Sequence, residues 1–349
     1  MVDSVPFPQV DVTFSPAWWH ANYGLGFEEE VWRDPIRRTE RDRDLRRLLY
    51  ERFGDVGLGE RDPKPQPNIE AYGHRFMAAL WGCEIRYLTN QAPAAVALPD
   101  AAERMAHLLA PDLDTSPVIQ QAFAEARQLE AHYGSCEGGI NLGGPLNNAV
   151  SVFGEEILYA CLAQPNLARR VLMVMAEVLL AVYDHVTCRI NHQEVVSPRP
   201  SAGIGNCPVC MISPETYRQV VLPADLWWRG HFAEFSLHHC GVFHPYAEVY
   251  QALRPAGLDV GWGTDLKVAR RAFPRVPMSL ELQDSAVMGK SESELDALLA
   301  QMVEDAGPRE LVTRIWLAEA CPATPDSTVR ALMTAPNRLQ NIRTGKGQG

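Results

Sequence analysis

The segment Phe235-Ser236-Leu237-His238-His239-Cys240-Gly241 alternates apolar and polar side chains over most of its length and then stops at a glycine. Residues two apart in a β-strand point to the same face, so this run predicts a strand that turns His238 and Cys240 the same way. His239 should point the opposite way. Gly241 ends the strand and opens a loop. In a barrel of alternating strands and helices, such strand ends carry the active-site residues.

Working outward from this segment, short apolar or β-rich runs recur from residue 70 onward, and amphipathic helical stretches separate them. Strands alternating with helices indicate parallel βα units. A chain of 349 residues is a common length for a barrel of such units. We therefore expect an α/β fold, a (β/α)8 TIM barrel. The expected strands are Glu84–Leu88, Gly203–Ile204, Phe235–Leu237, Leu258–Gly261, Met278–Leu282 and Leu311–Leu317, and the expected helices are 117–133, 148–163, 166–189, 213–221, 244–254, 265–272, 292–305 and 326–335.

The N-terminal part of the chain, residues 1–67, is polar and aromatic and shows no strand–helix alternation. Leu45, Leu48 and Leu49 recur at helical spacing and predict a charged helix that begins near Pro35. The sequence contains no internal repeat and no low-complexity linker. We expect one domain over residues 1–349, in which residues 1–67 form an arm lying across the barrel.

The composition is that of a globular protein, with 46% apolar and 21% charged residues. The formal net charge is −11, and an acidic chain does not attract phosphate backbones through its overall field. Nucleic acid is therefore excluded as an expected partner. We expect a small-molecule substrate as the partner of such a barrel. A homodimer is an assembly that the sequence leaves open.

The apolar segments do not predict a membrane protein. Residues 1–20 carry neither the basic start nor the apolar run of a signal peptide. The longest apolar stretch, Val171–Tyr183, is interrupted by Glu177 and is shorter than the roughly 20 residues that span a bilayer. We expect a cytoplasmic protein with no membrane partner. In that compartment, eight cysteines indicate thiols or metal ligands more than disulfides.

His238 and Cys240 supply an imidazole nitrogen and a thiolate, two ligands that zinc prefers. A third ligand has to come from another strand, and the run from Leu311 to Cys321 reads as a strand that ends in a cysteine. Taken alone, this evidence is weak. A His-x-Cys pair is more often structural, and a buried cysteine at a strand end is usually a small apolar residue.

A second cysteine motif, Cys207-Pro208-Val209-Cys210, follows an expected strand at Ser201–Gly205 and precedes a helix that begins at Ser213-Pro214-Glu215. The motif therefore belongs to a βα loop and opens on the same barrel face as His238. A C-x-x-C pair is found in redox sites and as half of a zinc site. Three readings stay open: loop cysteines without a separate role, additional metal or substrate contacts, and a redox disulfide.

Other candidate residues have weaker signals. The substrate-contact candidates are His20 and Tyr23, in an aromatic cluster that packs the arm or closes over the barrel mouth, and Asn141, near another expected strand end. The candidates for catalytic roles are Glu319 and His244. Glu319 precedes Cys321 by two residues and shares its face in a regular strand, as a proton acceptor, a resting ligand or a solvated carboxylate. His244 either contacts the residues that form the site or is an exposed surface histidine.

The stretch from about 143 to 335 resembles the uroporphyrinogen decarboxylase superfamily in the order of its motifs. The resemblance covers about two thirds of the chain. Several short motifs carry it. They are Gly144-Pro145-Leu146, Phe153-Gly154-Glu155-Glu156, Gln164-Pro165-Asn166, Ile212-Ser213-Pro214-Glu215-Thr216-Tyr217, Val221-Leu222-Pro223, Pro322-Ala323-Thr324-Pro325 and Val329-Arg330-Ala331-Leu332.

The superfamily contains two chemistries, and this sequence departs from one of them. The heme-pathway decarboxylases use no metal and carry an arginine-rich N-terminal motif and a late Gly-Asn turn. Here the corresponding stretches read Pro16-Ala17-Trp18-Trp19-His20 and Glu281-Leu282-Gln283-Asp284. Both departures count against decarboxylation of a porphyrinogen or another carboxylated substrate.

The other branch resembles methylcobamide:coenzyme M methyltransferase and chloromethane-utilisation proteins. Its members bind Zn2+ through a His-x-Cys pair on one strand and a cysteine on a later strand, and His238, Cys240 and Cys321 fall at those positions. The resemblance implies a zinc-dependent methyltransferase that moves a methyl group between a corrinoid protein and a thiol or related acceptor. The corrinoid (cobalamin) would sit on the partner protein. The alternatives are a metal-independent decarboxylase and a non-catalytic metal or tetrapyrrole binding protein.

Overall fold

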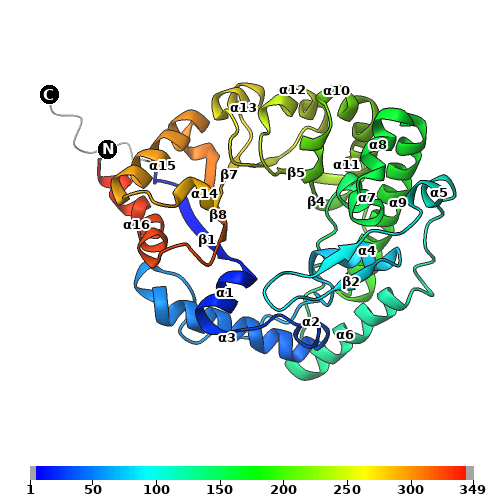
Figure 1. The fold of residues 1–349 in the computed structure, drawn as a ribbon, viewed down its shortest axis with the longest axis horizontal. Coiled ribbons are helices and arrows are strands. Elements are labelled where there is room, and N and C mark those ends of the chain that lie inside the picture. The colour runs from blue at the N-terminus through cyan, green and yellow to red at the C-terminus, as the bar shows by residue number, and fades with distance from the viewer. Residues whose placement is uncertain (1–4, 343–349) are drawn as a thin grey trace.

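A curled parallel sheet forms the centre of the protein, and helices cover its outer face (Figure 1). The computed structural model describes residues 5–342, with side chains through residue 340. Six parallel strands hydrogen-bond in the order β1-β8-β7-β6-β5-β4. They are β1 (Gln9–Phe14), β4 (Arg199–Gly205), β5 (Phe232–His239), β6 (Gly257–Val260), β7 (Met278–Leu282) and β8 (Val312–Ala320).

The sheet is open between β4 and β1, so the closed eight-stranded barrel that the sequence predicts is not formed by hydrogen-bonded strands among residues 5–342. Two irregular segments run through this gap. They meet at a parallel bridge between Asn68 and Glu137, where the Glu137 N–H also donates to the carbonyl of Pro67 at 2.9 Å. The result is a barrel-like curl with six regular strands, and the expected α/β class with parallel βα units is confirmed.

The helices begin at residues suited to the task. At several helix starts, the side chain of the residue before the helix accepts a backbone N–H of the first turn, which stabilises the start by about 1 kcal/mol. These residues include Ser15, Asp34, Ser116, Ser213 and Ser291. The helices are α1 (Pro16–Tyr23), α2 (Glu29–Arg33), α3 (Pro35–Phe53), α4 (Phe76–Leu80), α5 (Ala101–Ala106), α6 (Pro117–Tyr133), α7 (Pro145–Phe153), α8 (Glu156–Ala163), α9 (Pro165–Arg189), α10 (Pro214–Thr216), α11 (Leu222–Arg229), α12 (Ala247–Tyr250), α13 (Leu266–Ala272), α14 (Asp284–Val287), α15 (Glu292–Ala306) and α16 (Asp326–Ile342).

Two sequence expectations about strands are wrong. The run Glu84–Leu88 was expected in the barrel, but only Glu84–Arg86 (β2) is extended, and it pairs antiparallel with β3 (Ala94–Val96) in a separate two-stranded sheet. No strand is expected within the arm over residues 1–67, but residues 9–14 form β1, which pairs in parallel with β8 and is an edge strand of the main sheet. Both segments are short, so their own patterns could not show which neighbour they pair with.

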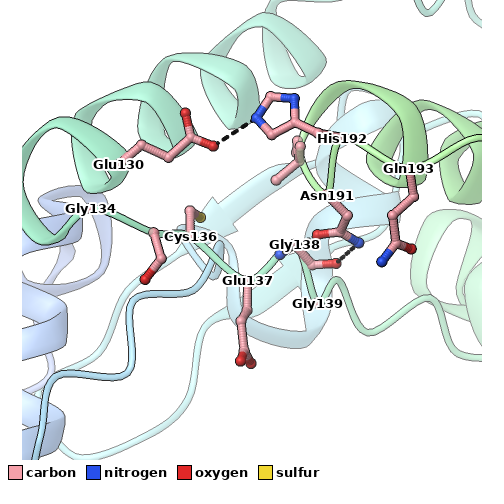
Figure 2. Close-up of a pocket in the computed structure, with 11 residues that line it drawn as sticks. Glu130, Gly134, Cys136, Glu137, Gly138, Gly139, Asn191, His192 and Gln193 are labelled. Carbon is pink, nitrogen blue, oxygen red and sulfur yellow. Dashed lines mark hydrogen bonds and ion pairs between the residues drawn. The ribbon is translucent and has the colours of Figure 1, made fainter.

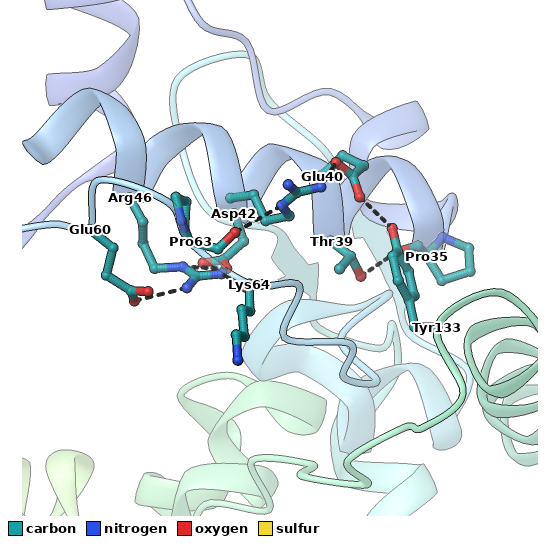
Figure 3. A network of polar contacts seen from close by, with 10 residues as sticks. Pro35, Thr39, Glu40, Asp42, Arg46, Glu60, Pro63, Lys64 and Tyr133 are labelled. Atoms are coloured by element: carbon teal, nitrogen blue, oxygen red, sulfur yellow. Dashed lines mark hydrogen bonds and ion pairs between the residues drawn. The ribbon is translucent and has the colours of Figure 1, made fainter. Parts of the chain in front are cut away.

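The remainder of the N-terminal segment packs on the barrel through α3. Within α3 and the loop after it, Arg46 pairs with Asp42 at 2.7 Å and with Glu60 at 2.9 Å (Figure 3). The Tyr133 hydroxyl of α6 donates to Glu40 at 2.8 Å, which ties α3 to α6. These contacts join the N-terminal segment to the helix layer.

The longest helix, α9, is long and apolar enough by length and composition to cross a membrane. Its apolar face lies in the protein core, where Val171, Leu172, Met175 and Leu179 have no exposed surface. A core helix passes the same test of length and composition. The buried helix expected around Val171–Tyr183 is thus confirmed.

Strand alternation explains why the curl encloses space. On β4 to β7 the side chains that point toward the helices are large and buried, such as Ile204, Phe235, Leu258 and Leu280. Several inward positions of the same strands are small: Gly203 and Gly205 on β4, Ser236 on β5 and Gly257 on β6. Barrels usually fill their interior with branched side chains, and here the small residues leave a cavity.

Candidate functional site

The cavity has a volume of about 930 Å³ and runs along the inside of the curled sheet. Pro277 and Thr313 line it near the starts of their strands, and Cys207, Cys240 and Glu319 line it near the carboxyl ends. Active sites of βα barrels lie at the carboxyl ends of the strands. This end of the cavity also gathers the titratable residues, so it is the candidate functional site.

Three metal-type donors meet at the cavity wall. The donor atoms of Cys207, His238 and Cys240 all lie within 4.8 Å of one another. The Cys240 Sγ is 2.8 Å from the Cys207 Sγ and 2.9 Å from the His238 Nε2. His238 is on β5, Cys240 directly follows that strand, and Cys207 follows the neighbouring β4. Two adjacent βα loops therefore build the cluster.

The second ring nitrogen of His238 is held by a carboxylate. Its Nδ1 lies 2.9 Å from Asp259, an inward residue of β6, and the indole N–H of Trp316 on β8 donates to the same carboxyl group at 3.0 Å. A histidine that binds a metal usually donates its other N–H to such a group, which fixes the ring and the tautomer. Asp259 thus turns the Nε2 of His238 toward the two thiols.

The pKa values of Cys207 and His238 are shifted from the ordinary values of these side chains. The hydrogen bond from the Cys240 thiol, together with His238, lowers the pKa of Cys207 although burial opposes this. Burial tends to lower the pKa of His238, but its hydrogen bonds to Asp259 and Cys207 raise it to about 10. Cys207 as a thiolate beside protonated His238 is the arrangement these shifts favour. A divalent cation would take the place of the protons that hold the three groups together.

His239 faces away from the cavity, as strand alternation predicts. Its side chain is fully buried, and its Nδ1 lies 2.8 Å from the hydroxyl of Tyr250 in the helix layer. Burial lowers the pKa of His239 to about 4, so the ring is neutral near pH 7. The histidine pair therefore divides into one residue that serves the site and one that serves the core.

A buried polar network lies behind Cys207. The Asn206 amide donates to the carboxylate of Asp225 at 2.9 Å, and the Tyr217 hydroxyl donates to the same oxygen at 2.6 Å. Asn206 and Asp225 are fully buried, and burial raises the pKa of Asp225 to about 6. Tyr217 begins a turn of π-helix, which displaces the helix locally. The network fixes the backbone from which Cys207 projects.

Glu281 on β7 is a further acidic residue near the cluster. Its pairing register puts it level with Trp316 on β8. Glu281 is 6% exposed, and its Oε2 has no hydrogen-bond partner among the described residues. Burial raises the pKa of this carboxyl, which favours its protonated form.

The structure does not bring Cys321 into the cluster. Its nearest described polar contacts are with Thr324, whose hydroxyl lies 3.8 Å from the Cys321 Sγ and accepts the Cys321 N–H at 2.9 Å. Cys321 directly follows β8, which is three strands from β5. The third donor expected from Cys321 is in this structure Cys207. Glu319 lines the cavity as a catalytic candidate should.

The other predicted residues divide between the cavity and its surroundings. Asn141 and Cys207 line the cavity, whereas His20, Tyr23, Cys210 and His244 are not among its lining residues. His20 is exposed beside Leu25, and Tyr23 packs on Trp18 and Trp19. The Cys210 thiol is exposed and contacts the carbonyl of Cys207 at 3.1 Å. His244 accepts the backbone N–H of Asp265 and so supports a loop.

A second hollow, of about 780 Å³, lies between the ends of α6 and α9 (Figure 2). Glu130 and His192 form an ion pair at 3.0 Å across it, and the Asn191 amide binds the backbone of Gly138. Three-donor metal clusters among the described residues do not include any of these side chains. The hollow is a polar surface feature on the side where α9 leads into β4, away from the carboxyl ends of the strands.

These features define a class of protein: a βα protein with a curled parallel sheet and a Cys/His cluster at the carboxyl end of its cavity. No protein-family model matches the sequence, and no curated protein sequence matches it. A solved structure of a methyltransferase from Methanosarcina mazei is similar in fold, with a TM-score of 0.61, 16% identity, and coverage of 97% of this chain and 95% of that one. A vitamin-B12-independent methionine synthase structure from Listeria monocytogenes has a TM-score of 0.44, 13% identity and coverage of 99% and 100%, and is too distant to support an inference.

Three site residues were missed by the sequence analysis. Asp259 holds His238, Trp316 holds Asp259, and Arg75 is on the cavity wall. The sequence does contain a signal for Asp259, which is an acidic residue inside the apolar run Leu258–Gly261. Strand alternation turns it to the side opposite Leu258. Trp316 and Arg75 left no comparable signal, since an aromatic residue in a strand and an arginine before a short helix are common.

Proposed function

We propose that this protein is a metal-dependent methyltransferase that binds Zn2+ at Cys207, His238 and Cys240 and moves a methyl group between a corrinoid protein and a thiol or related acceptor. The observation that carries this proposal is the convergence of one imidazole and two thiols within 4.8 Å at the cavity wall. The fold of the Methanosarcina mazei methyltransferase supports it at the level of architecture. We also propose that the protein belongs to the uroporphyrinogen decarboxylase superfamily. The two irregular segments that meet at residues 68 and 137 would then take the places of two barrel strands.

The residues fit a zinc ion on two grounds. One nitrogen and two sulfur donors are the ligand types of catalytic zinc sites, which keep the fourth position open for substrate. The Asp259 carboxylate on the far nitrogen of His238 is the support that such a ligand usually has. Zinc bound here would keep an acceptor thiol deprotonated at neutral pH, where a free thiol with a pKa near 8.5 is mostly protonated.

The protein's own groups would then position and deprotonate the acceptor. His238 keeps its orientation through Asp259, which Trp316 holds in turn. Glu319 lies on the cavity wall and is the candidate to accept the proton that the acceptor thiol loses. The methyl carbon would bond to the acceptor sulfur as its bond to cobalt breaks, with that electron pair staying on the corrinoid. A cytoplasmic location and the corrinoid partner remain predictions.

Methyl transfer and metal content test the proposal together. Purified protein should hold about one zinc per chain and should consume methylcobalamin in the presence of a thiol, which the change in the corrinoid absorption spectrum reports. Metal-free protein that demethylates no corrinoid but releases CO2 from a carboxylated substrate would favour the metal-independent decarboxylase. One zinc per chain with no turnover of any methylated corrinoid would favour the non-catalytic binding protein.

A further inference from the structure

The cavity wall carries one fixed positive charge. Arg75 is the one arginine or lysine among the described residues that line the cavity. Its guanidinium contacts two neutral oxygens, the Pro93 carbonyl and the Ser151 hydroxyl, each at 3.4 Å. No ion pair joins Arg75 to a carboxylate within residues 5–340, whereas the buried Arg38 pairs with Glu125 at 3.0 Å. Arg75 is thus a partly buried cation without a counter-ion in the described structure.

The cavity wall that carries Arg75 also carries hydrogen-bonding side chains. The Asn141 oxygen accepts the Gly143 N–H at 3.0 Å, which turns its amide nitrogen to the Nδ1 of His74 at 2.7 Å. Because Nδ1 accepts from Asn141, a neutral His74 carries its proton on Nε2 and can donate it. His74, Asn141 and Ser151 line the same cavity as Arg75. This part of the wall offers N–H and O–H donors beside a guanidinium, the set that binds carboxylates.

Helix α7 sets the distance between Arg75 and the metal cluster. The side chain of Asn147 is a hydrogen-bonding neighbour of Cys207, and Ser151 contacts Arg75. Asn147 and Ser151 are four residues apart in the same helix, which corresponds to a rise of about 6 Å. The helix positions next to the cluster and next to Arg75 are therefore about one helical turn apart, and the side chains at both ends extend that span.

We propose that Arg75, with Ser151 and His74, forms a carboxylate-binding subsite, and that the acceptor binds along α7 with its sulfur at the metal cluster and its carboxylate at Arg75. The proposal rests on the proposed function, because it takes the metal cluster as the place where the sulfur binds. A bidentate pair between the guanidinium and a carboxylate would supply the missing counter-ion. The substrate class is then a short thiol acid.

Thiol binding to cobalt-substituted protein tests the subsite without measuring turnover. Each thiol is titrated while the sulfur-to-cobalt charge-transfer absorption is recorded. The probes are 3-mercaptopropionate and its neutral isostere 3-mercaptopropionamide. We expect the acid to bind about 10- to 100-fold more tightly, the range for a hydrogen bond to a charged group. Arg75→Gln should remove this preference while retaining cobalt, and Arg75→Lys should keep part of it.

Arg86→Gln is the matched control, because Arg86 is exposed on β2 and pairs with Glu84. It should retain the full preference for the acid. Equal binding of the two probes to wild-type protein, or an unchanged preference in Arg75→Gln, would overturn the subsite and leave the proposed function standing. No increase of this absorption with any added thiol would overturn the metal as the place where the acceptor sulfur binds, and the subsite with it. Loss of cobalt from Arg75→Gln would assign Arg75 to the integrity of the cluster and overturn its role in binding carboxylate.

Discussion

Replacing Cys207 with serine removes one of the three donors that the structure brings together, and it should weaken metal binding. The Cys207 Sγ lies 2.8 Å from the Cys240 Sγ, and both thiols share the cluster with His238. Serine keeps the size of the side chain but offers a hydroxyl, which stays protonated and is a poor zinc ligand at neutral pH. The exposed Cys210, three residues along the same loop, provides a matched control.

The magnitude follows from the number of donors. Structural zinc sites with four ligands bind with about 10–16 kcal/mol, or about 3 kcal/mol for each ligand. A loss of about 3 kcal/mol weakens the zinc affinity about 100-fold, since 1.4 kcal/mol corresponds to a factor of ten. Cys207→Ser should therefore raise the zinc Kd about 100-fold, and Cys210→Ser should change it by less than about threefold.

Competition with a chromophoric chelator measures the zinc Kd, and the cobalt-substituted proteins report the number of thiolates through their charge-transfer absorption. The wild-type protein should show two thiolate ligands, and Cys207→Ser should show one. Cys321→Ser is the decisive comparison, because the sequence predicts Cys321 as the third ligand. If Cys321→Ser loses the metal while Cys207→Ser binds it with wild-type affinity, the ligand set inferred from the structure is wrong.

Three further changes test the surroundings of the cluster. His238→Ala should lose bound zinc while His239→Ala retains it, because His239 faces Tyr250; equal loss by metal analysis would contradict the strand geometry. Asp259→Asn should weaken the zinc affinity about 10- to 100-fold by chelator competition, as expected for removal of the carboxylate that orients a ligand, and an unchanged Kd would refute that role. Burial raises the pKa of Asp225 from 3.8 to about 6, so its protonation stabilises the fold below about pH 4, and this contribution is lost as the pH rises through about 6. Between pH 4 and 7 the free energy of unfolding of the wild-type protein should therefore fall by about 3 kcal/mol more than that of Asp225→Asn. Urea denaturation at each pH measures this difference. The same pH dependence in both proteins would contradict the prediction.

The part of the fold that the sequence predicts is the part with long, regular periodicity. The strands at Met278–Leu282 and Leu258–Gly261 and the helices between them occur where the pattern predicts them, within a few residues. The errors fall on short segments. Residues 9–14 carry only six residues of alternation, and their partner β8 lies about 300 residues further along the chain. Such a pairing depends on the closing of the sheet, which no local pattern records.

The ligand set shows where sequence reasoning could have gone further. Consecutive βα units usually place their strands side by side. The expected strands at Ser201–Gly205 and Phe235–Leu237 are consecutive, and in the structure Gly205 pairs with His238. Cys207 follows Gly205 by two residues, and Cys240 follows His238 by two. Equal offsets on paired neighbouring strands put the two thiols at the same level.

Cys321 lacks this relation to the pair. It follows β8, and three strand spacings of about 4.8 Å separate β8 from β5 along the sheet, or about 14 Å before the curl shortens the path. A thiol there reaches His238 only across the cavity, and the curvature that sets this distance is absent from the sequence. Cys207 reaches Cys240 through direct strand pairing, which any curvature preserves. Adjacent-strand geometry therefore favours Cys207 as the third donor, and the paired serine variants at Cys207 and Cys321 decide between local pairing and contact across the barrel.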